Sequence, residues 1–208
     1  LGANWDGHEE LRAKVRTDTP HYGNDNDEAD ALAVRMVREL ELEVGRYRNV
    51  RGGRFILGLW SFWAHVSTGK VLAASADGRG HGESLSHSMD PMMGRGLAGP
   101  TAAIRSGSKI DTSELANGGS MLLEFQPKLL RSPEGMGAVA ALVRTYFALG
   151  GIQLQLSCVS AETLEAAVSD PDRHRHLVVR VAGYCDYFTR QGPDQQAYII
   201  AREKFEAM

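Results

Sequence analysis

The chain has 208 residues, and its 23 Lys and Arg against 26 Asp and Glu give a formal net charge of −3 at pH 7. This near balance argues against a strongly basic nucleic-acid-binding protein. Apolar residues make up 43% and charged residues 24% of the sequence, which is typical of folded globular chains and excludes a wholly disordered one. We find neither an apolar run of the roughly 18 residues that cross a membrane nor a secretion signal, so we expect no membrane and no nucleic-acid partner.

The cysteine content points to a reducing compartment. Two cysteines, Cys158 and Cys185, cannot build a disulfide framework or a four-cysteine zinc site, and we therefore expect a cytoplasmic location. The chain begins at Leu1 and not at Met, which predicts a fragment of a longer protein.

The first third of the sequence predicts two helices. Residues 6–17 form a short amphipathic pattern, and an acidic turn over 22–28 leads into a longer helix over about 27–47. Acidic residues in the first turn of this helix favour its dipole. Apolar residues at helical spacing predict one buried stripe on it, made of Leu32, Met36, Leu40, Val44 and Tyr47.

The middle of the chain is less regular. Residues 55–65 are apolar and aromatic and predict a strand. A glycine-dense segment follows over 69–119. A loop-rich region of this length is uncommon in a compact domain unless it serves a site or packs against something else.

The last third carries the clearest pattern. Ser132 as N-cap and Pro133 at the first helical position predict a helix that ends at Gly150 and Gly151. Its expected buried stripe consists of Met136, Val139, Val143 and Phe147. Alternating residues over 152–158 predict a strand, 161–168 a helix, 177–181 a second strand, and 192–207 a final helix. The β-α-β order favours an α/β fold, with parallel pairing as one option.

Several groups of residues admit a functional and a structural interpretation. The Asp- and His-rich segment 170–176 has the spacing of a chelating loop, but a solvated turn is the favoured interpretation because short motifs match by chance. Asn24 to Asp27 lacks the glycine and glutamate of a calcium loop, and we expect a helix-entry turn and no metal site. Trp60, Phe62 and Trp63 are candidates for an apolar substrate pocket, with plain core packing as the alternative.

The stretch Arg180-Val-Ala-Gly-Tyr-Cys-Asp-Tyr-Phe188 is the most informative one. An apolar strand runs directly into Gly183, which aromatic residues follow. By pattern alone, Gly183 marks a bulge, a tight turn or a close backbone approach. Cys158 and Cys185 are candidate nucleophiles or redox thiols, but no local pattern indicates an activated thiolate, and Cys158 reads as a core residue on a strand face.

The same stretch resembles the glycyl radical signature of the pyruvate formate-lyase-like family, Arg-Val-(Ser/Ala)-Gly-(Tyr/Phe) followed by Phe. Further segments are similar to the family in the same order, so that the resemblance covers essentially the whole chain. They are Asn4 to Arg12, Tyr22 to Asp25, Ala76 to Arg79 with Gly82 and Glu83, Gly99 to Ala102 with Ser106 and Lys109, Arg144 to Phe147 with Gly150 and Gly151, and Gln155 with Val159 and Ser160.

The resemblance implies that Gly183 stores a radical, with Arg180, Val181, Ala182, Tyr184 and Phe188 forming the radical loop that an activating enzyme recognises. That enzyme uses S-adenosylmethionine and an iron–sulfur cluster to remove one hydrogen atom, and this chain binds no cofactor itself. Glycine suits the role because a Cα radical must flatten between two peptide groups, which a side chain hinders.

The resemblance also implies a ten-stranded α/β barrel, of which this chain is the C-terminal portion. We expect 1–120 to be an incomplete barrel part and 121–208 the glycyl radical domain. The family's thiyl cysteine lies in a Gly-Cys-x-Glu segment that is absent here, and neither Cys158 nor Cys185 matches it. The chain alone is therefore expected to be inactive. Its expected partners are the activating enzyme, the N-terminal portion with that cysteine and a small substrate, in a homodimer of the full enzyme.

The reaction class stays open at this point. The family cleaves or forms C–C or C–heteroatom bonds anaerobically. Apolar residues such as Trp60 and Met92 favour an apolar or aromatic substrate, as in an arylacetate decarboxylase or a fumarate-adding synthase. The alternatives are a dehydratase or lyase of the same family, a stand-alone spare-part protein that restores an oxygen-damaged lyase, and a non-enzymatic α/β domain in which Gly183 is only a bulge.

Overall fold

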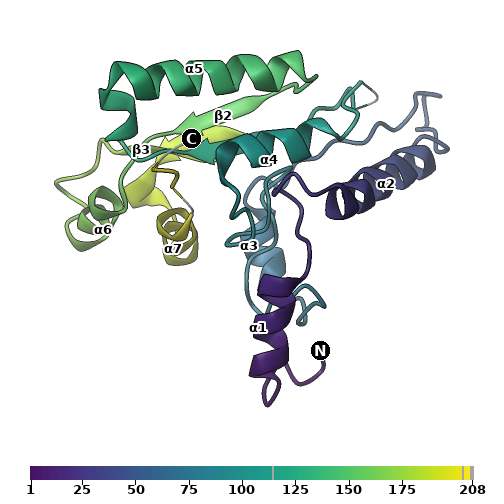
Figure 1. Ribbon diagram of the computed structural model, residues 1–208, viewed down its shortest axis with the longest axis horizontal. Helices are drawn as coiled ribbons and strands as arrows, with labels where there is room; N and C mark the ends of the chain where they lie inside the picture. The colour runs from purple at the N-terminus through teal and green to yellow at the C-terminus, as the bar shows by residue number, and fades with distance from the viewer. Residues whose placement is uncertain (114, 203, 207–208) are drawn as a thin grey trace.

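The computed structural model describes residues 1–113, 115–202 and 204–206. Helices and short strands alternate along the chain, with long connections in its first half (Figure 1). The order is α1 (Glu9–Asp18), α2 (Asp27–Val44), α3 (Ala64–Gly69), α4 (Gly99–Ser108), β1 (Met121–Glu124), η1 (Leu129–Arg131), α5 (Pro133–Ala148), β2 (Leu154–Ser157), α6 (Ala161–Ser169), β3 (Val178–Ala182), β4 (Tyr184–Tyr187), η2 (Phe188–Arg190) and α7 (Pro193–Ala201).

A parallel strand pair forms the first core. β1 and β2 pair in parallel from Met121↔Leu154 to Glu124↔Ser157, and α5 connects them. The helix begins as expected, because the Ser132 side chain accepts a hydrogen bond from the Gly135 N–H. α5 and α4 supply the residues that pack with β1, including Ile104, Leu142 and Tyr146. On the other edge of β1, Phe125 forms a parallel bridge with Phe205 near the C-terminus.

The second core belongs to the hairpin β3–β4. The two strands pair in antiparallel fashion from Val178↔Tyr187 to Ala182↔Tyr184, with an irregularity between Arg180 and Ala182. Helices α6 and α7 cover it, and Val179, Val181, Phe188 and Ile199 are buried among them. The hairpin lies close to the end of the chain, next to β2 in Figure 1.

The longest N-terminal helix is held by buried charge. Asp30 in α2 is fully buried, accepts a hydrogen bond from the Ser106 hydroxyl and pairs with Lys109 at 2.7 Å. Lys109 also contacts Asp25 and Asp27. The hydrogen bond with Asp30, with further ones to the other two carboxylates, raises the pKa of Lys109 above its ordinary value. These contacts fix α2 with the face of Asp30, Val34 and Val37 turned inward.

Two expectations on the first half are wrong. The predicted stripe on α2 is not buried: Leu32, Met36, Leu40 and Tyr47 are exposed, because the Asp30 contacts orient the opposite face inward. Residues 55–65 do not form a strand beyond an isolated bridge between Leu59 and Gly119. The backbone of Phe62 has a φ of 47°, which interrupts extended geometry.

The last third follows the expected elements with a different pairing. The helix α5, the strand β2, the helix α6 and the strand β3 occur where they were expected, but β2 and β3 do not pair with each other. The strand β4 was not predicted, and the final helix, expected over 192–207, ends at Ala201, because Phe205 pairs with Phe125. On α5, Val139 is buried as predicted, whereas Met136 and Phe147 are exposed. The described elements form a mixed α/β unit with two two-stranded sheets, and a barrel is not seen among them. No helix in the described part of the chain combines the length and the apolarity needed to cross a membrane.

Candidate functional site

Gly183 is the single residue between β3 and β4. Ala182 and Tyr184 on either side of it are paired with each other, so the hairpin turns on this residue. Its φ is +21°, at the edge of the left-handed region, which favours a residue without Cβ. Ala182 is fully buried, whereas Gly183 is half-buried and Tyr184 is exposed. The structure therefore places the predicted radical residue at the tip of a tight, well-packed hairpin.

The indole of Trp60 lies against this tip. A Cβ built on Gly183 would meet Trp60 Cζ3 at 3.4 Å and Cε3 at 3.7 Å. The indole is held in place because its Nε1–H donates to the Asn117 carbonyl at 2.8 Å. Gly118 allows this close approach, since a Cβ at that position would stand 2.9 Å from Trp60 Cζ2. Trp60 thus covers one side of Gly183.

The three predicted pocket aromatics do not line one cavity. The Phe62 ring stacks near Trp60, with ring centroids 6.3 Å apart. Trp63 instead lines a shallow hollow of about 310 Å³ together with Tyr184 and the start of α7. Phe62 and Trp63 are both more than half exposed. A substrate role for this trio stays a prediction.

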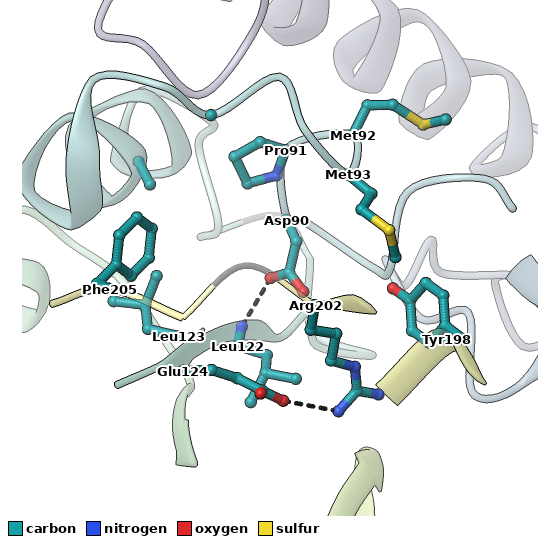
Figure 2. A pocket seen from close by; sticks show the side chains of 12 residues that line it. Asp90, Pro91, Met92, Met93, Leu122, Leu123, Glu124, Tyr198, Arg202 and Phe205 are labelled. Carbon is teal, nitrogen blue, oxygen red and sulfur yellow. Dashed lines mark hydrogen bonds and ion pairs between the residues drawn. The ribbon is translucent and has the colours of Figure 1, made fainter. Parts of the chain in front are cut away.

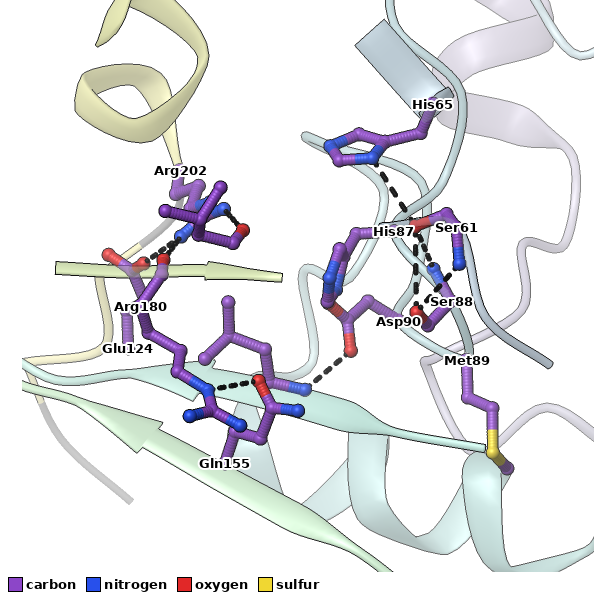
Figure 3. Close-up of polar contacts among 12 residues, drawn as sticks. Ser61, His65, His87, Ser88, Met89, Asp90, Glu124, Gln155, Arg180 and Arg202 are labelled. Atoms are coloured by element: carbon purple, nitrogen blue, oxygen red, sulfur yellow. Dashed lines mark hydrogen bonds and ion pairs between the residues drawn. The ribbon is translucent and has the colours of Figure 1, made fainter. Parts of the chain in front are cut away.

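A buried arginine clamps the strand that leads to Gly183. Arg202, just after α7, donates hydrogen bonds to the carbonyl oxygens of Arg180, at 2.6 Å, and of Val181. It also pairs with Glu124 Oε1 at 3.0 Å (Figure 3). The clamp joins the end of β1, the strand β3 and the segment after α7. Sequence reasoning missed Arg202 and Glu124, because they stand 78 positions apart and belong to no local motif.

Arg180 ties the hairpin to the neighbouring sheet. Its Nε–H donates to Gln155 Oε1 on β2 at 2.8 Å (Figure 3), and its Nη1 lies 3.3 Å from Cys185 Sγ on β4. Val181, Ala182 and Phe188 of the predicted radical loop are buried around it. The structure therefore brings the loop residues together, although recognition by an activating enzyme stays a prediction.

A buried polar chain lies between α7 and the loops before β1. His87 Nδ1 is 2.6 Å from Asp90 Oδ2, and Asp90 Oδ1 accepts from the Leu122 N–H at 2.6 Å. The His65 ring packs edge-on against His87 and Tyr198. Burial lowers the pKa of His65 to about 3, helped by the charge of His87, and burial raises the pKa of Asp90. His65 is therefore poorly placed to carry a positive charge.

Asp90 and Tyr198 of this polar group border a small cavity of about 80 Å³. Asp90, Tyr198, Arg202 and Glu124 contribute its polar lining, and Met92 and Met93 also line it (Figure 2). No periodic pattern in the sequence predicts this cavity, because its residues come from a loop, α4, β1 and the region of α7. A volume of this size holds a few water molecules, which is too small for a substrate of more than a few atoms.

The remaining candidates are surface features. The segment 170–176 is an exposed turn between α6 and β3. Asn26 caps α2 through its side chain, as expected for a helix entry. Cys158 follows β2 and is half-buried, which raises the pKa of its thiol, and Cys185 is exposed. Within residues 1–113, 115–202 and 204–206, no three His, Cys, Asp or Glu side chains are grouped to hold a metal ion.

The comparison with known proteins identifies the class. The sequence profile described as "Glycine radical" matches residues 85–189, just over half of the chain, and the profile "Pyruvate formate lyase-like" matches residues 1–69. The chain therefore belongs to the glycyl radical enzyme family, as its sequence motifs predict.

Particular members of this family are similar to the chain along nearly its whole length. The chain is 36% identical to the probable dehydratase YbiW of Escherichia coli (strain K12) and 33% identical to trans-4-hydroxy-L-proline dehydratase of Clostridioides difficile, over 97% of its length and 26% of theirs. Its structure is similar to that of the B12-independent glycerol dehydratase from Clostridium butyricum, with a TM-score of 0.96 and 34% identity over 100% of this chain and 26% of that one. Relatives of similar identity include isethionate sulfite-lyases and an indoleacetate decarboxylase. The chain spans about a quarter of the length of these relatives.

Proposed function

We propose that this chain is the radical-storing C-terminal portion of a glycyl radical enzyme of the dehydratase or lyase kind, with Gly183 as the radical residue. The observation that carries the proposal is the placement of Gly183. Gly183 is the sole turning residue of a hairpin that lies within the matched family segment. Arg202 holds the strand that leads to it, and Trp60 lies against one side of it.

The surroundings of Gly183 suit a stored radical. An unpaired electron on Cα is stabilised by the adjacent amide nitrogen and carbonyl group when the centre is flat, and glycine alone leaves room for this. The hydrogen bonds from Arg202 fix the strand up to Val181. The Trp60 ring shields one side of Gly183. These contacts restrict the approach of oxygen and solvent to Gly183 from that side.

The substrate class predicted from the sequence needs revision. An arylacetate decarboxylase or a fumarate-adding synthase rested on the apolar residues around Trp60, but these do not line a common pocket. Three of the relatives described above are dehydratases, and others are sulfite-lyases. We therefore favour elimination of water or of a comparable leaving group from a small substrate over decarboxylation.

The activating enzyme and the thiyl cysteine are further parts of this proposal. An activating enzyme that uses S-adenosylmethionine would remove one hydrogen atom from Gly183. The thiyl cysteine would come from a segment outside this chain, since Cys158 and Cys185 do not lie in a Gly-Cys-x-Glu sequence. The division into a barrel part, 1–120, and a radical domain, 121–208, the full barrel, the homodimer and the cytoplasmic location stay predictions.

Backbone cleavage by air tests the proposal. A glycyl radical reacts with oxygen and breaks the chain at its own position. After anaerobic activation and exposure to air, we expect mass spectrometry to find a fragment that ends at Gly183 or directly before it. The Gly183→Ala variant should stay intact, and the matched Gly192→Ala variant, at an open position, should be cleaved normally. Cleavage elsewhere, or equal cleavage of Gly183→Ala, would contradict the assignment.

A further inference from the structure

Four arginines gather around one turn in the first half of the chain. This arginine cluster consists of Arg12 and Arg16 on α1, Arg79 in the turn itself and Arg95 in the connection before α4. A Cβ built on Gly78, in the same turn, would stand 2.6 Å from Arg16 Cγ and 3.4 Å from Arg95 Nη2. Arg12 Nε donates to the Gly78 carbonyl oxygen at 2.9 Å. Side chains from separate segments therefore meet at this glycine.

Two carboxylates lie in the arginine cluster, and other donors already occupy both. Glu83 pairs with Arg12 and also accepts a hydrogen bond from a backbone N–H at 3.0 Å. Asp77 accepts from a serine hydroxyl and from a backbone N–H of its own turn. Across residues 1–113, 115–202 and 204–206, no carboxylate forms an ion pair with Arg16 or Arg95. Four positive groups against two negative ones leave an excess of two positive charges at this turn.

Arg95 carries a buried charge without a counter-charge. The residue is 4% exposed, and its single side-chain hydrogen bond in the described part of the chain runs from Nη2 to the carbonyl oxygen of Asp77 at 3.3 Å. Its Nε–H is buried and has no acceptor among the same residues. Burial and the positive charge of Arg16 lower the pKa of Arg95 below its ordinary value. A buried charge without a partner is costly, and an unpaired buried donor calls for an explanation in a folded chain.

Arg16 offers a second guanidinium beside the first. It stands in the last turn of α1, is half-buried, and its stem passes over Gly78. The ion pairs of α1 use Arg12 and Lys14, and none of the described hydrogen bonds or ion pairs uses the guanidinium of Arg16. A guanidinium carries five N–H donors, so nearly all donors of Arg16 and Arg95 have no acceptor among the described residues. Because Arg16 is partly exposed, a ligand can reach the pair from solvent.

We infer that a tetrahedral oxyanion, phosphate or sulfate, binds between the guanidiniums of Arg16 and Arg95 beside Gly78. Guanidinium N–H groups bind oxyanions through paired hydrogen bonds. Two guanidiniums from different segments call for an ion with more than two oxygen atoms, which favours phosphate or sulfate over a carboxylate. The ion would balance the excess positive charge and supply an acceptor for the buried Nε–H of Arg95. The inference goes beyond the proposed function, because it uses no residue of the radical hairpin.

Thermal unfolding of the chain tests this site. Sodium chloride and inorganic phosphate would be compared at equal ionic strength, because the screening of surface charges is then the same in both. We expect about 10 mM phosphate to raise the Tm by about 4 °C, the shift that a Kd of about 1 mM produces in a chain of this size. Sulfate should act in the same direction. Arg16→Gln should lose most of the rise. Arg175→Gln, in an exposed turn, should keep it, and this control accounts for the general stabilising effect of the two anions.

Arg95→Met gives a second, independent readout. The substitution keeps most of the aliphatic stem and removes a buried charge that has no partner. In chloride, the variant should therefore unfold at the Tm of the parent chain or above it, and phosphate should not raise its Tm. A clear loss of Tm in chloride would mean that the charge of Arg95 is compensated without a bound ion, which contradicts the inference.

Three further results would overturn the inference. The first is the absence of a phosphate response in the parent chain. The second is a response that Arg16→Gln and Arg95→Met both retain, which would indicate an adventitious ion only. The third is a response that disappears when the chain is assembled with the upstream portion of a related dehydratase, because a carboxylate of that portion would then pair with the two arginines. The assay needs no radical and no activating enzyme, so its outcome is independent of the assignment of Gly183.

Discussion

The buried pair of Arg202 and Glu124 offers the sharpest test of how the radical hairpin is held. Arg202 is 8% and Glu124 4% exposed, and their contact distance is 3.0 Å. The substitution Arg202→Met keeps the aliphatic stem. It removes the ion pair and the hydrogen bonds to the carbonyl oxygens of Arg180 and Val181.

The magnitude follows from what is left behind. Loss of one partner of a buried ion pair costs about 3–5 kcal/mol, because the other charge stays buried without compensation. Here Lys204 Nζ lies 3.7 Å from Glu124 Oε2 and retains part of the compensation. We therefore expect Arg202→Met to lower the free energy of unfolding by about 3 kcal/mol, at the lower end of that range.

Urea unfolding followed by circular dichroism measures this loss, and hydrogen exchange of the β3 amides should locate it in the hairpin. The double variant Glu124→Met with Arg202→Met should lose less than the sum of the single variants, by up to about 3 kcal/mol. Arg175→Met is the control: its pair with Asp172 is exposed and should change stability by less than about 0.5 kcal/mol. A loss below about 1 kcal/mol for Arg202→Met, or additive double variants, would refute the reasoning.

Three further predictions concern Gly183 and its neighbours. Gly183→Ala should fold and lose only about 1 kcal/mol from backbone strain, since its Cβ would stand 3.4 Å from Trp60, and it should form no radical; Gly137→Ala, in an open helical position, should form it normally. Trp60→Ala should shorten the lifetime of the radical in air severalfold, measured by electron paramagnetic resonance, whereas the exposed Trp63→Ala should not. Burial holds the pKa of His65 at about 3, below its ordinary 6.5, so that between these pH values the unfolded state binds more protons than the folded state. The free energy of unfolding should therefore fall as the pH drops from 6.5 to 3. His65→Phe should flatten this fall, measured by urea unfolding at several pH values.

The elements of the last third were predictable because their signals are local. The Ser132-Pro133 start of α5, the alternation along β2 and the apolar run of β3 each depend on neighbouring residues. The pairing was not predictable in the same way. β1 finds β2 across the intervening helix, and β4 is short, polar and aromatic, with a single glycine in place of a turn motif.

On α2, local pattern gave the wrong face. Its apolar residues predict a buried stripe, but a buried aspartate decides the orientation through contacts with Ser106 and Lys109. Those partners lie 76 and 79 positions away. A helical periodicity shows that two faces differ and does not show which of them a distant charge will hold against the core.

The candidate site also combines residues that the sequence predicts with residues that only the fold brings together. Gly183 and its loop follow from a contiguous motif, so that sequence alone identifies them. The other parts of the site are contacts between segments separated by more than 20 residues: Arg202 with Arg180, Trp60 with Gly183, and Arg180 with Gln155. Their residue types are ordinary in the sequence, and only their positions in space relate them to Gly183.

Anaerobic electron paramagnetic resonance tests the central claim most directly. The chain would be incubated with the activating enzyme of a related dehydratase, S-adenosylmethionine and a reductant, alone and together with the upstream portion of that relative. The account predicts a doublet, from coupling to the one remaining α-hydrogen, that collapses when Gly183 is deuterated at Cα and is absent in Gly183→Ala. A silent spectrum under both conditions, with the relative itself activated in parallel, would contradict it and leave Gly183 as the turning residue of a hairpin.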